Sequence, residues 1–338
     1  MINRILIRAK YIWRNTSLGR VKKAPNALKW GFIGTGYMSD TFARAISGNK
    51  DNILYAILSR SIEKARQFSR SHGNPIPYGN IEDMLANKNI DIIYVATPVE
   101  CHYKQVKKCL EAKKNVLCEK PLTMSASEAK ELFRIAKDNN CFLMEGMWSM
   151  CLPTMRIAKK WIKEGRIGHP EFIHADLNKR LLPDHVRKHH GVLYDYGVYG
   201  IAFVHTFMNG LDDVISVVSR KDMSGNNITD ISIQYEADGC KGILNICSNF
   251  EALSKAVIIG SEGSIEWNSP FNRTNTIRLF DKNGVLSETY STQYTEEGFE
   301  YELEELTRIV KTGTNESEFI TEQDTMHCLT MINTLSNG

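Results

Sequence analysis

Two largely apolar stretches of the chain contain side chains that can exchange protons. The first, VLCEKPL at residues 116–122, places Glu119 and Lys120 ahead of a proline. The second, GVLYDYGVYGIAF at residues 191–203, holds Asp195 and Tyr199 four residues apart, a spacing that puts them on one face of a helix. Amines, carboxylates and phenols can all transfer protons in catalysis. These residues are therefore the candidate reactive groups.

The apolar runs around the first stretch predict a doubly wound α/β domain. Short hydrophobic runs alternate with polar segments that favour helices, which is typical of βαβ units and a parallel sheet. The expected strands are 30–33, 53–58, 90–96, 115–118 and 142–144, and the expected helices are 39–46, 62–69 and 125–138. Lys120 would lie at the carboxyl edge of this sheet, where such folds bind ligands.

Beyond residue 150 the pattern changes to closely spaced strands with turn signals between them, which predicts an α+β domain with a mostly antiparallel open sheet. The expected strands are 214–219, 231–235, 243–247, 256–260 and 277–280, and the expected helices are 154–163, 299–311 and 322–335. The domain division that follows is an extension over 1–27, a Rossmann domain over 28–149 and an α+β domain over 150–338.

A glycine motif follows the first expected strand. In GFIGTGYMS, Gly34, Gly36 and Ser39 take the three positions of G-x-G-x-x-G. The first glycine permits a tight turn, the second lets the backbone approach a pyrophosphate, and Ser39 is small enough for the third position. The strand-to-helix context favours dinucleotide binding over an ordinary glycine turn. The expected cofactor-binding residues of this loop are Gly34, Thr35, Gly36, Tyr37 and Met38.

The end of the second expected strand bears on the choice of cofactor. It reads Leu58-Ser59-Arg60-Ser61, with no carboxylate to bind the ribose hydroxyls of NAD before Glu63. The guanidinium of Arg60 suits a 2′-phosphate, so Ser59 and Arg60 favour NADP(H) over NAD(H). The alternative is that Arg60 is a solvated loop charge or stacks on adenine.

Three motifs carry a resemblance in their order and spacing. They are Gly34-Thr35-Gly36, Ala96-Thr97-Pro98 with His102, and Glu119-Lys120-Pro121. From residue 28 onward the chain resembles the glucose-fructose oxidoreductase / inositol dehydrogenase (Gfo/Idh/MocA) family. The resemblance implies that Lys120 reaches the nicotinamide and the substrate hydroxyl, and that the bond before Pro121 is cis. It extends the expected cofactor site to Ala96, Thr97, Pro98, His102, Glu119 and Lys120, with His102 either capping the nicotinamide end or only capping the next helix.

The second stretch resembles the family's D-x-G-x-x-x-H/Y helix, in which Asp195 and Tyr199 would contact the substrate. Tyrosine at the last position is similar to the dimeric dihydrodiol dehydrogenase and glucose-fructose oxidoreductase branches. Glu145, Trp148 and Pro153 in FLMEGMWSMCLP match the dihydrodiol dehydrogenase-like branch.

Two departures from that branch bear on the substrate. Met150 and Cys151 stand where the branch usually has Arg and Phe, and His189-His190-Gly191 replaces its glycine-rich approach to the helix. The expected substrate-binding residues are Lys120, Trp148, His190, Asp195 and Tyr199.

The chemistry expected from this resemblance is hydride transfer coupled to proton transfer. Tyr199 would give or take the hydroxyl proton, and because a phenol has a pKa of about 10, a nearby cation such as Lys120 would have to lower it. Asp195 would orient the substrate and keep Lys120 charged. The alternatives are that Lys120 is itself the acid/base and that Tyr199 is a core residue.

Composition limits the partners. The formal charge of +3 is too small to predict nucleic-acid binding, and no apolar window is long enough to span a membrane. The eight cysteines form no C-x-x-C pair, a pattern that suits a reducing cytoplasm, and the histidines at 185, 189 and 190 lack partners for a metal site. Residues 1–23 carry seven basic and no acidic residues, which allows a membrane-surface or partner contact besides a simple extension.

The expected function is that of a cytoplasmic NADP(H)-dependent oxidoreductase acting on a hydroxyl or keto carbon. The substrate would be a sugar, sugar derivative, cyclic polyol or dihydrodiol. The family resemblance implies that residues 150–338 bind substrate and form a homodimer or homotetramer. The alternative is a non-catalytic dinucleotide-binding regulator or sensor on the same fold.

Overall fold

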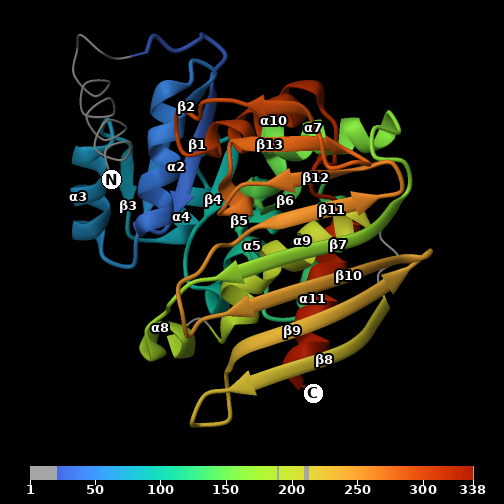
Figure 1. Cartoon of the computed structure of the whole chain (residues 1–338). Coiled ribbons are helices and arrows are strands. Elements are labelled where there is room, and N and C mark those ends of the chain that lie inside the picture. Colours follow the sequence, from blue (N-terminus) through green and yellow to red (C-terminus); the bar gives the residue numbers. More distant parts are fainter. Residues whose placement is uncertain (1–20, 189, 209–212, 338) are drawn as a thin grey trace. The chain divides into compact units, whose positions relative to one another are not determined.

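The structure, a computed structural model, describes residues 21–188, 190–208 and 213–337 (Figure 1). These residues form two compact units. The first unit contains the described residues of Met1–Trp148 together with Tyr294–Glu322, and the second contains those of Ser149–Gln293 together with Gln323–Gly338. Most of the amino-terminal extension, residues 1–20, lies outside the described residues, and so does its predicted surface contact.

The first unit is built on a parallel sheet of six strands in the order β3-β2-β1-β4-β5-β6, as the alternating pattern predicted. This is the strand order of the Rossmann fold, with a switch point between β1 and β4. The strands are β1 Leu28–Ile33, β2 Asn52–Leu58, β3 Ile76–Tyr78, β4 Ile92–Val95, β5 Asn115–Glu119 and β6 Leu143–Gly146. β4 is buried throughout because helices cover both faces of a parallel sheet.

The helices of this unit begin with side-chain caps that the sequence encodes. Ser61, Asn80 and Ser125 each accept a hydrogen bond from a backbone N–H in the first turn that follows. The helices and short 3₁₀ turn of the first unit are α2 Tyr37–Gly48, α3 Ile62–Ser71, α4 Ile81–Leu85, η1 Val99–Cys101, α5 His102–Glu111, α6 Ala126–Asp138 and α10 Phe299–Thr312. Lys23, in the described end of the extension, donates to the carbonyls of Ile46 and Asn49 at the end of α2.

Helix α10 belongs to the first unit, although the domain division expected from sequence placed it with residues 150–338. It packs on α2, where the ring centroid of Phe299 lies 6.5 Å from that of Phe42 and 4.7 Å from that of Trp148. Farther along the helix, the hydroxyl of Thr307 accepts a hydrogen bond of 2.8 Å from Asn52. Apolar and polar contacts therefore hold this late segment against residues that lie about 250 positions earlier.

The second unit contains a mostly antiparallel sheet of eight strands in the order β14-β13-β12-β11-β7-β10-β9-β8, and only β7 and β10 are parallel neighbours within it. The strands are β7 Pro170–Asn178, β8 Asp213–Lys221, β9 Ile228–Ala237, β10 Cys240–Cys247, β11 Ala256–Gly260, β12 Gly263–Trp267, β13 Thr276–Asp281 and β14 Leu286–Ser291. Asp238 and Gly239 both have positive φ between β9 and β10, as the tight turn of a two-residue hairpin requires.

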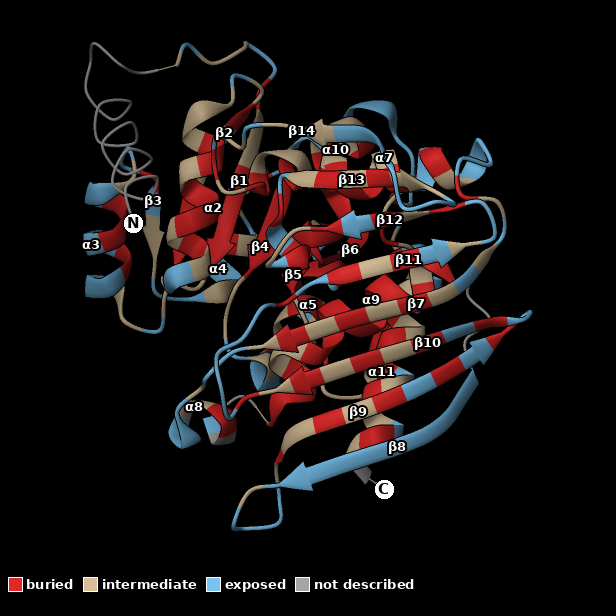
Figure 2. Ribbon diagram, in the orientation of Figure 1, coloured by how far each residue is buried: buried red, intermediate tan, exposed pale blue. Residues whose placement is uncertain are grey.

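Helices cover one face of this sheet. Its helical segments are η2 Trp148–Cys151, which begins at the last residue of the first unit, α7 Pro153–Lys163, α8 Pro183–Lys188, η3 Leu193–Gly197, α9 Val198–Phe207, η4 Phe271–Arg273 and α11 Glu322–Asn337. A Cβ at Gly200 of α9 would lie 2.4 Å from Cδ1 of Leu244 in β10, so glycine lets the helix approach the strand closely. Figure 2 shows the buried residues of β7, β9 and β10 alternating with less buried ones, as a half-covered sheet requires.

The sequence patterns located most of these elements, but among the strands they missed β3, β7, β12 and β14. β7 lies inside the sheet. Its outward positions include His174, Asp176 and Asn178, so polar residues interrupt its apolar pattern. None of the helices in the described ranges is long and apolar enough to cross a bilayer.

Candidate active site

The turn between β1 and α2 has the geometry of a dinucleotide-binding loop. Gly34 has a φ of +113°, and a Cβ there would lie 2.4 Å from the carbonyl oxygen of Ala96. Only glycine fits this position. Ser39 donates from its hydroxyl to the carbonyl of Gly34 at 2.8 Å, so the third motif position also closes the turn.

The amino terminus of α2 is open to a ligand. Gly36 is its N-cap residue and makes no side-chain cap, and a Cβ at this position would meet no heavy atom within 4 Å. Backbone N–H groups at such a terminus bind phosphate. Tyr37 is exposed and Met38 half-buried beside this terminus. The residues present therefore fit the pyrophosphate of a dinucleotide.

The end of β2 presents Arg60 as its charged group. The side chain of Arg60 is exposed, and within the described residues it makes no ion pair. Glu63, the nearest carboxylate in sequence, accepts a hydrogen bond of 2.9 Å from the hydroxyl of Ser61, the cap of α3. The backbone of Ser59 donates to the carbonyl of Tyr78 and continues the sheet.

The loops after β4 and β5 are tied together by His102. Its Nε2 lies 2.8 Å from the carbonyl oxygen of Thr97, and its Nδ1 lies 3.0 Å from that of Pro121. Burial lowers the pKa of His102, although the two carbonyls oppose this effect. The ring therefore links the loop that contains Thr97 to the loop that contains Pro121, two of the predicted cofactor-binding segments. A direct contact of His102 with the cofactor stays a prediction.

Lys120 is half-buried in a loop that is held on both sides. The Lys120–Pro121 peptide bond is cis, as the family resemblance implied. Behind it, the N–H of Leu122 donates to Oε1 of the fully buried Glu145 at 2.9 Å. The loop therefore has an anchored carbonyl at Pro121 and an anchored N–H at Leu122, which fixes the backbone that carries the lysine.

A buried acidic group lies beneath this loop. Glu119 accepts a hydrogen bond from the hydroxyl of Tyr94, and burial raises the pKa of its carboxyl. Glu302 of α10 is 1% exposed, and its Oε1 has no hydrogen-bond partner within the described residues. Burial, with a smaller contribution from the charge of Glu119, holds the pKa of Glu302 well above its usual range. Burial therefore favours the protonated form of Glu302 over the carboxylate.

In the second unit, Asp195 and Tyr199 lie on either side of a change in helix type. Residues Leu193–Gly197 form a π-helical turn in which the N–H of Val198 donates to the carbonyl of Leu193, and α9 then begins. A regular α-helix, which the four-residue spacing assumed, was the wrong prediction for this turn. π-helical turns widen a helix locally and are frequent at functional sites. Tyr199 is 9% exposed.

Asp195 is paired with a residue that the sequence analysis did not place in the site. Nε2 of His185 in α8 lies 2.7 Å from Oδ2 of Asp195. Next to Asp195, Lys179 donates to the hydroxyl of Tyr196, and its ammonium lies 4.9 Å from the ring centroid. Two residues from outside the π-helical turn therefore contact it, His185 at Asp195 and Lys179 at Tyr196.

The other predicted substrate residues have different settings. His190 has a φ of +58°, and its ring centroid lies 6.1 Å from that of Tyr194. Tyr194 is buried and accepts a hydrogen bond of 2.9 Å from Asn333 of α11, which marks it as a structural residue. Trp148 is buried against Phe299 in the first unit, and its substrate contact stays a prediction.

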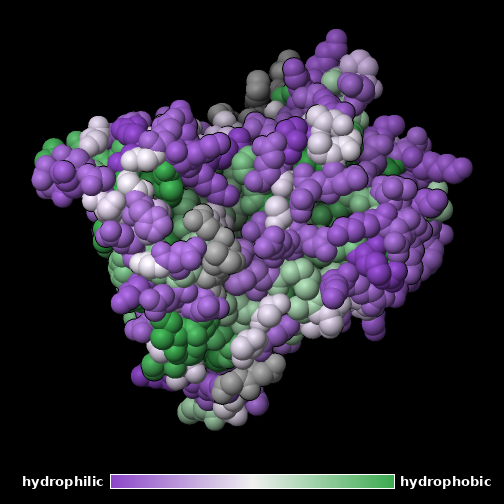
Figure 3. All heavy atoms as spheres, turned by 90° about the vertical axis from the view of Figure 1, so that its right-hand side faces the viewer, coloured by the Kyte–Doolittle hydropathy of each residue, from purple (hydrophilic) through white to green (hydrophobic). Residues whose placement is uncertain are grey.

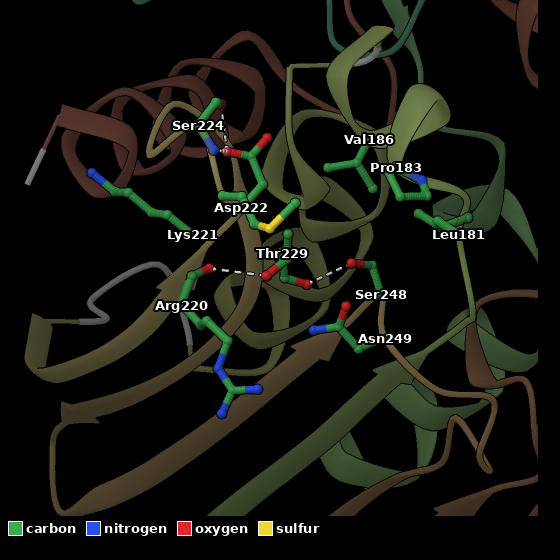
Figure 4. A pocket seen from close by; sticks show the side chains of 11 residues that line it. Leu181, Pro183, Val186, Arg220, Lys221, Asp222, Ser224, Thr229, Ser248 and Asn249 are labelled. Atoms are coloured by element: carbon green, nitrogen blue, oxygen red, sulfur yellow. Dashed lines mark hydrogen bonds between the residues drawn. The ribbon is translucent and has the colours of Figure 1, made fainter.

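A cavity of about 410 Å³ lies behind α8 in the second unit. Figure 4 shows the apolar side chains of Leu181, Pro183 and Val186 on one side of it and the start of the β8–β9 connection on the other. Val186 follows His185 directly, so one short helix lines the cavity and also carries the partner of Asp195.

Comparison with known proteins identifies the family. A family model described as "Oxidoreductase family, NAD-binding Rossmann fold" matches residues 28–147, and one described as "GFO/IDH/MocA C-terminal domain" matches residues 155–266. The chain belongs to the Gfo/Idh/MocA oxidoreductase family. As a member of this family it is an NAD(P)-binding enzyme of the dehydrogenase/reductase type.

Among Gfo/Idh/MocA relatives, a trans-1,2-dihydrobenzene-1,2-diol dehydrogenase of Xenopus laevis is 34% identical over 248 residues, which cover 71% of this chain and 75% of that protein. The 3-ketoreductase KijD10 of Actinomadura kijaniata, in complex with NADP and TDP-benzene, has a TM-score of 0.80 at 20% identity and covers 91% of this chain and 97% of its own. A levoglucosan dehydrogenase with NADH and levoglucosan has a TM-score of 0.83 at 18% identity, covering 92% and 96%. The two structures share the fold and hold different nicotinamide cofactors.

The Gfo/Idh/MocA motifs did not indicate the residues that support the site. The burial of Glu302 could have been predicted, because it stands in the apolar stripe of an amphipathic helix with Phe299, Leu303 and Leu306. The histidines at 185, 189 and 190 stood out in the sequence, but the pairing of His185 with Asp195 could not be predicted, since a spacing of ten residues across a loop implies no contact.

Proposed function

We propose that this enzyme is an NADP(H)-dependent oxidoreductase that acts on a hydroxyl or keto carbon of a sugar, sugar derivative, cyclic polyol or dihydrodiol. The observation that carries the proposal is the anchored loop of Lys120, at the same sheet edge as the open turn of Gly34 and Gly36. When bound, the nicotinamide supplies or accepts the hydride.

The preference for NADP(H) is inferred from the end of β2. Arg60 is exposed there, and Glu63 is engaged by Ser61 in capping α3. A guanidinium can make paired hydrogen bonds to a 2′-phosphate, whereas the ribose hydroxyls of NAD are usually bound by a carboxylate. The other proposed cofactor contacts of this unit are Thr35, Tyr37, Met38, Ser59, Ala96, Thr97 and Pro98.

The proposed acid/base is Tyr199, which exchanges a proton between its hydroxyl oxygen and the substrate oxygen. Lys120 supplies positive charge beside the substrate oxygen, where negative charge develops as the proton leaves, and Asp195 orients the substrate hydroxyls. His185 holds the carboxylate of Asp195 at 2.7 Å, which fixes the orientation of that side chain. In the alternative assignment Lys120 is the acid/base.

We propose that the protein is located in the cytoplasm. Its eight cysteines are all free, six of them buried, and free cysteines are typical of a reducing compartment. A homodimer or homotetramer is also proposed, as the family resemblance implies.

Two measurements test the function. Calorimetric titration with NADPH and NADH should show tighter NADPH binding, and Arg60→Ala should reduce that difference. Absorbance at the nicotinamide band should then reveal turnover with one of the proposed substrates. Lys120→Ala and Tyr199→Phe should remove turnover while NADPH still binds, and Tyr194→Phe is the matched control because that hydroxyl bonds Asn333. Unchanged turnover in the first two variants would overturn the catalytic assignment.

A further inference from the structure

The cavity behind α8 has the size of a small-molecule site and lies wholly within the second unit. Its volume is about 410 Å³, and the ligand pockets of proteins usually measure about 300 to 1,000 Å³. Three segments line it, namely the loop and helix that follow β7, the β8–β9 connection with the start of β9, and the residues after β10. Segments far apart in the sequence therefore meet around one hollow.

One wall of the cavity is apolar, and so is part of its rim. Leu181, Pro183 and the buried Val186 form the wall. Leu182 lies beside them and is 75% exposed, and Met223 in the β8–β9 connection is fully exposed. Figure 3 shows another face of the molecule, which is mostly hydrophilic and has its hydrophobic side chains gathered in a few areas. Apolar side chains gathered on such a surface are typical of a place where the apolar part of a ligand binds.

The hydroxyl groups of the cavity have already committed their protons. Ser248 donates to the carbonyl of Thr229 at 2.8 Å, and Thr229 donates to protein acceptors, the nearer being Oδ2 of Asp230 at 2.8 Å. Ser224 donates in the same way to Oδ1 of Asp222 at 2.6 Å. Because a hydroxyl has one proton and two lone pairs, these oxygens can bond a ligand only as acceptors.

Asn249 adds a further acceptor. It is exposed after β10, and its Nδ2 donates to Oδ2 of Asp230, which fixes the way the amide points. Figure 4 shows the amide oxygen on the side of Ser248. A ligand that bonds to these groups must supply the protons, as hydroxyl groups do.

The charged groups around the cavity are directed away from it or are already bonded. Figure 4 shows the charged ends of Arg220 and Lys221 pointing away from the apolar wall. The carboxylate of Asp222 accepts hydrogen bonds from Ser224 and Asn227, which hold its pKa at about 2. A carboxylate surrounded by donors has little capacity left for a ligand. An uncharged ligand therefore fits the cavity better than an anion or a cation.

Helix α8 connects the cavity to the candidate active site. Val186 lines the cavity, and Nε2 of the preceding His185 lies 2.7 Å from Oδ2 of Asp195. α8 has six residues, too few for a helix that is stable by itself, so its position depends on what packs against it. A ligand that packs against Val186 would therefore restrict His185 as well.

We propose that this cavity is a second binding site, for a small uncharged ring compound with hydroxyl groups on one side and an apolar face on the other, and that its occupancy holds α8 against Asp195. The hydroxyl groups donate to Ser248, Thr229 and Asn249, and the apolar face covers Val186. The effect on catalysis rests on the proposed function, which assigns Asp195 to substrate orientation. The binding itself does not.

The first test is calorimetric titration of the full chain, without cofactor, with trans-cyclohexane-1,2-diol as the probe. The wild type should bind the diol, and Leu181→Trp should abolish binding because the indole fills the cavity. Leu253→Trp is the matched control, since Leu253 is 63% exposed in the neighbouring loop and does not line the cavity. Asn249→Leu, at an exposed position that the fold tolerates, should weaken binding about fivefold by removing one acceptor. A wild type that does not bind the diol, or equal binding by the wild type and the Leu181 variant, would overturn the proposal.

Amide hydrogen exchange tests the connection to α8, again without turnover. The diol should slow exchange at residues 184–188 in the wild type and leave it unchanged in Leu181→Trp. Unchanged exchange in the wild type at saturating diol would refute the effect on α8.

Steady-state kinetics supply the last readout, on the substrate that the absorbance screen identifies. The diol should raise kcat/KM about twofold in the wild type and not in Leu181→Trp. Inhibition that grows with diol concentration would place the diol in the active site and overturn the proposal. Because binding and exchange need no turnover, a failure of the proposed function would leave both of those results intact.

Discussion

Nε2 of His185 lies 2.7 Å from Oδ2 of Asp195 and joins α8 to the π-helical turn ahead of α9. The two residues are on different elements, so the pair fixes the turn that precedes Tyr199. The carboxylate that we assign to substrate orientation is therefore itself held by a neighbouring ring.

Replacing His185 by alanine should lower kcat/KM about tenfold, because Asp195 would lose the partner that orients it. Asp195→Asn should lower it further. Steady-state kinetics on the substrate identified by the absorbance screen provide the measurement, with Asp184→Asn on the same helix as the control. Equal kinetics in the wild type and the His185 variant would show that the pair does not position Asp195 for catalysis.

Glycine substitutions should separate folding from nucleotide binding. Gly36→Ala should fold normally, because its Cβ would enter open space, and should weaken NADPH binding at least tenfold by crowding the pyrophosphate. Gly34→Ala should instead destabilise the fold, because its Cβ would meet the carbonyl of Ala96 at a positive φ. Thermal unfolding and calorimetric titration measure the two effects. Wild-type NADPH affinity in the Gly36 variant would place the pyrophosphate elsewhere.

Glu302→Gln should stabilise the protein increasingly as the pH rises. The pKa of Glu302 is raised by burial and by Glu119, so the stability that its bound proton provides is complete below the unfolded value of 4.5. That stability is lost as the pH rises toward the folded pKa, by about 1.4 kcal/mol per pH unit. Glutamine has no such proton, so the gap between variant and wild type should widen from pH 5 upward in urea unfolding.

Glu305 in the same helix is the matched control for Glu302. Burial would raise the pKa of its carboxyl, but hydrogen bonds from Arg308, Ser317 and the backbone of Glu318 lower it overall. Its contribution to stability is therefore present above the unfolded pKa and lost as the pH falls. Glu305→Gln should destabilise at neutral pH. A Glu302 variant that behaves in the same way would mean that Glu302 is ionised.

Tyr94→Phe should destabilise the first unit by about 1 to 3 kcal/mol, since it leaves a buried oxygen of Glu119 without its donor. Tyr78→Phe is the control, because that hydroxyl accepts from the half-exposed Asn87. Equal urea midpoints for the two variants would contradict a structural role for the Tyr94 hydroxyl.

The strands of the first unit were predictable because each is a short apolar run between helix signals, and the motifs at their ends located Gly34 and Lys120. Contacts between distant segments were not predictable in this way. Nothing near Phe299 in the sequence indicates that it packs on Phe42, because packing partners are chosen by the whole fold. The π-helical turn was hidden for a related reason, since its residues have the same spacing as those of an α-helix.

The return of α10 to the first unit also constrains synthesis of the protein. The strands that carry the nucleotide turn and Lys120 are complete by Gly146, but the helix that covers α2 is not available until Thr312 has left the ribosome. Until then the rings of Phe42 and Trp148 lack the partner that Phe299 provides. The part of the first unit that Phe299 covers therefore stays open to solvent while the whole second sheet is being made, and exposed apolar surface of this kind favours aggregation before folding is complete.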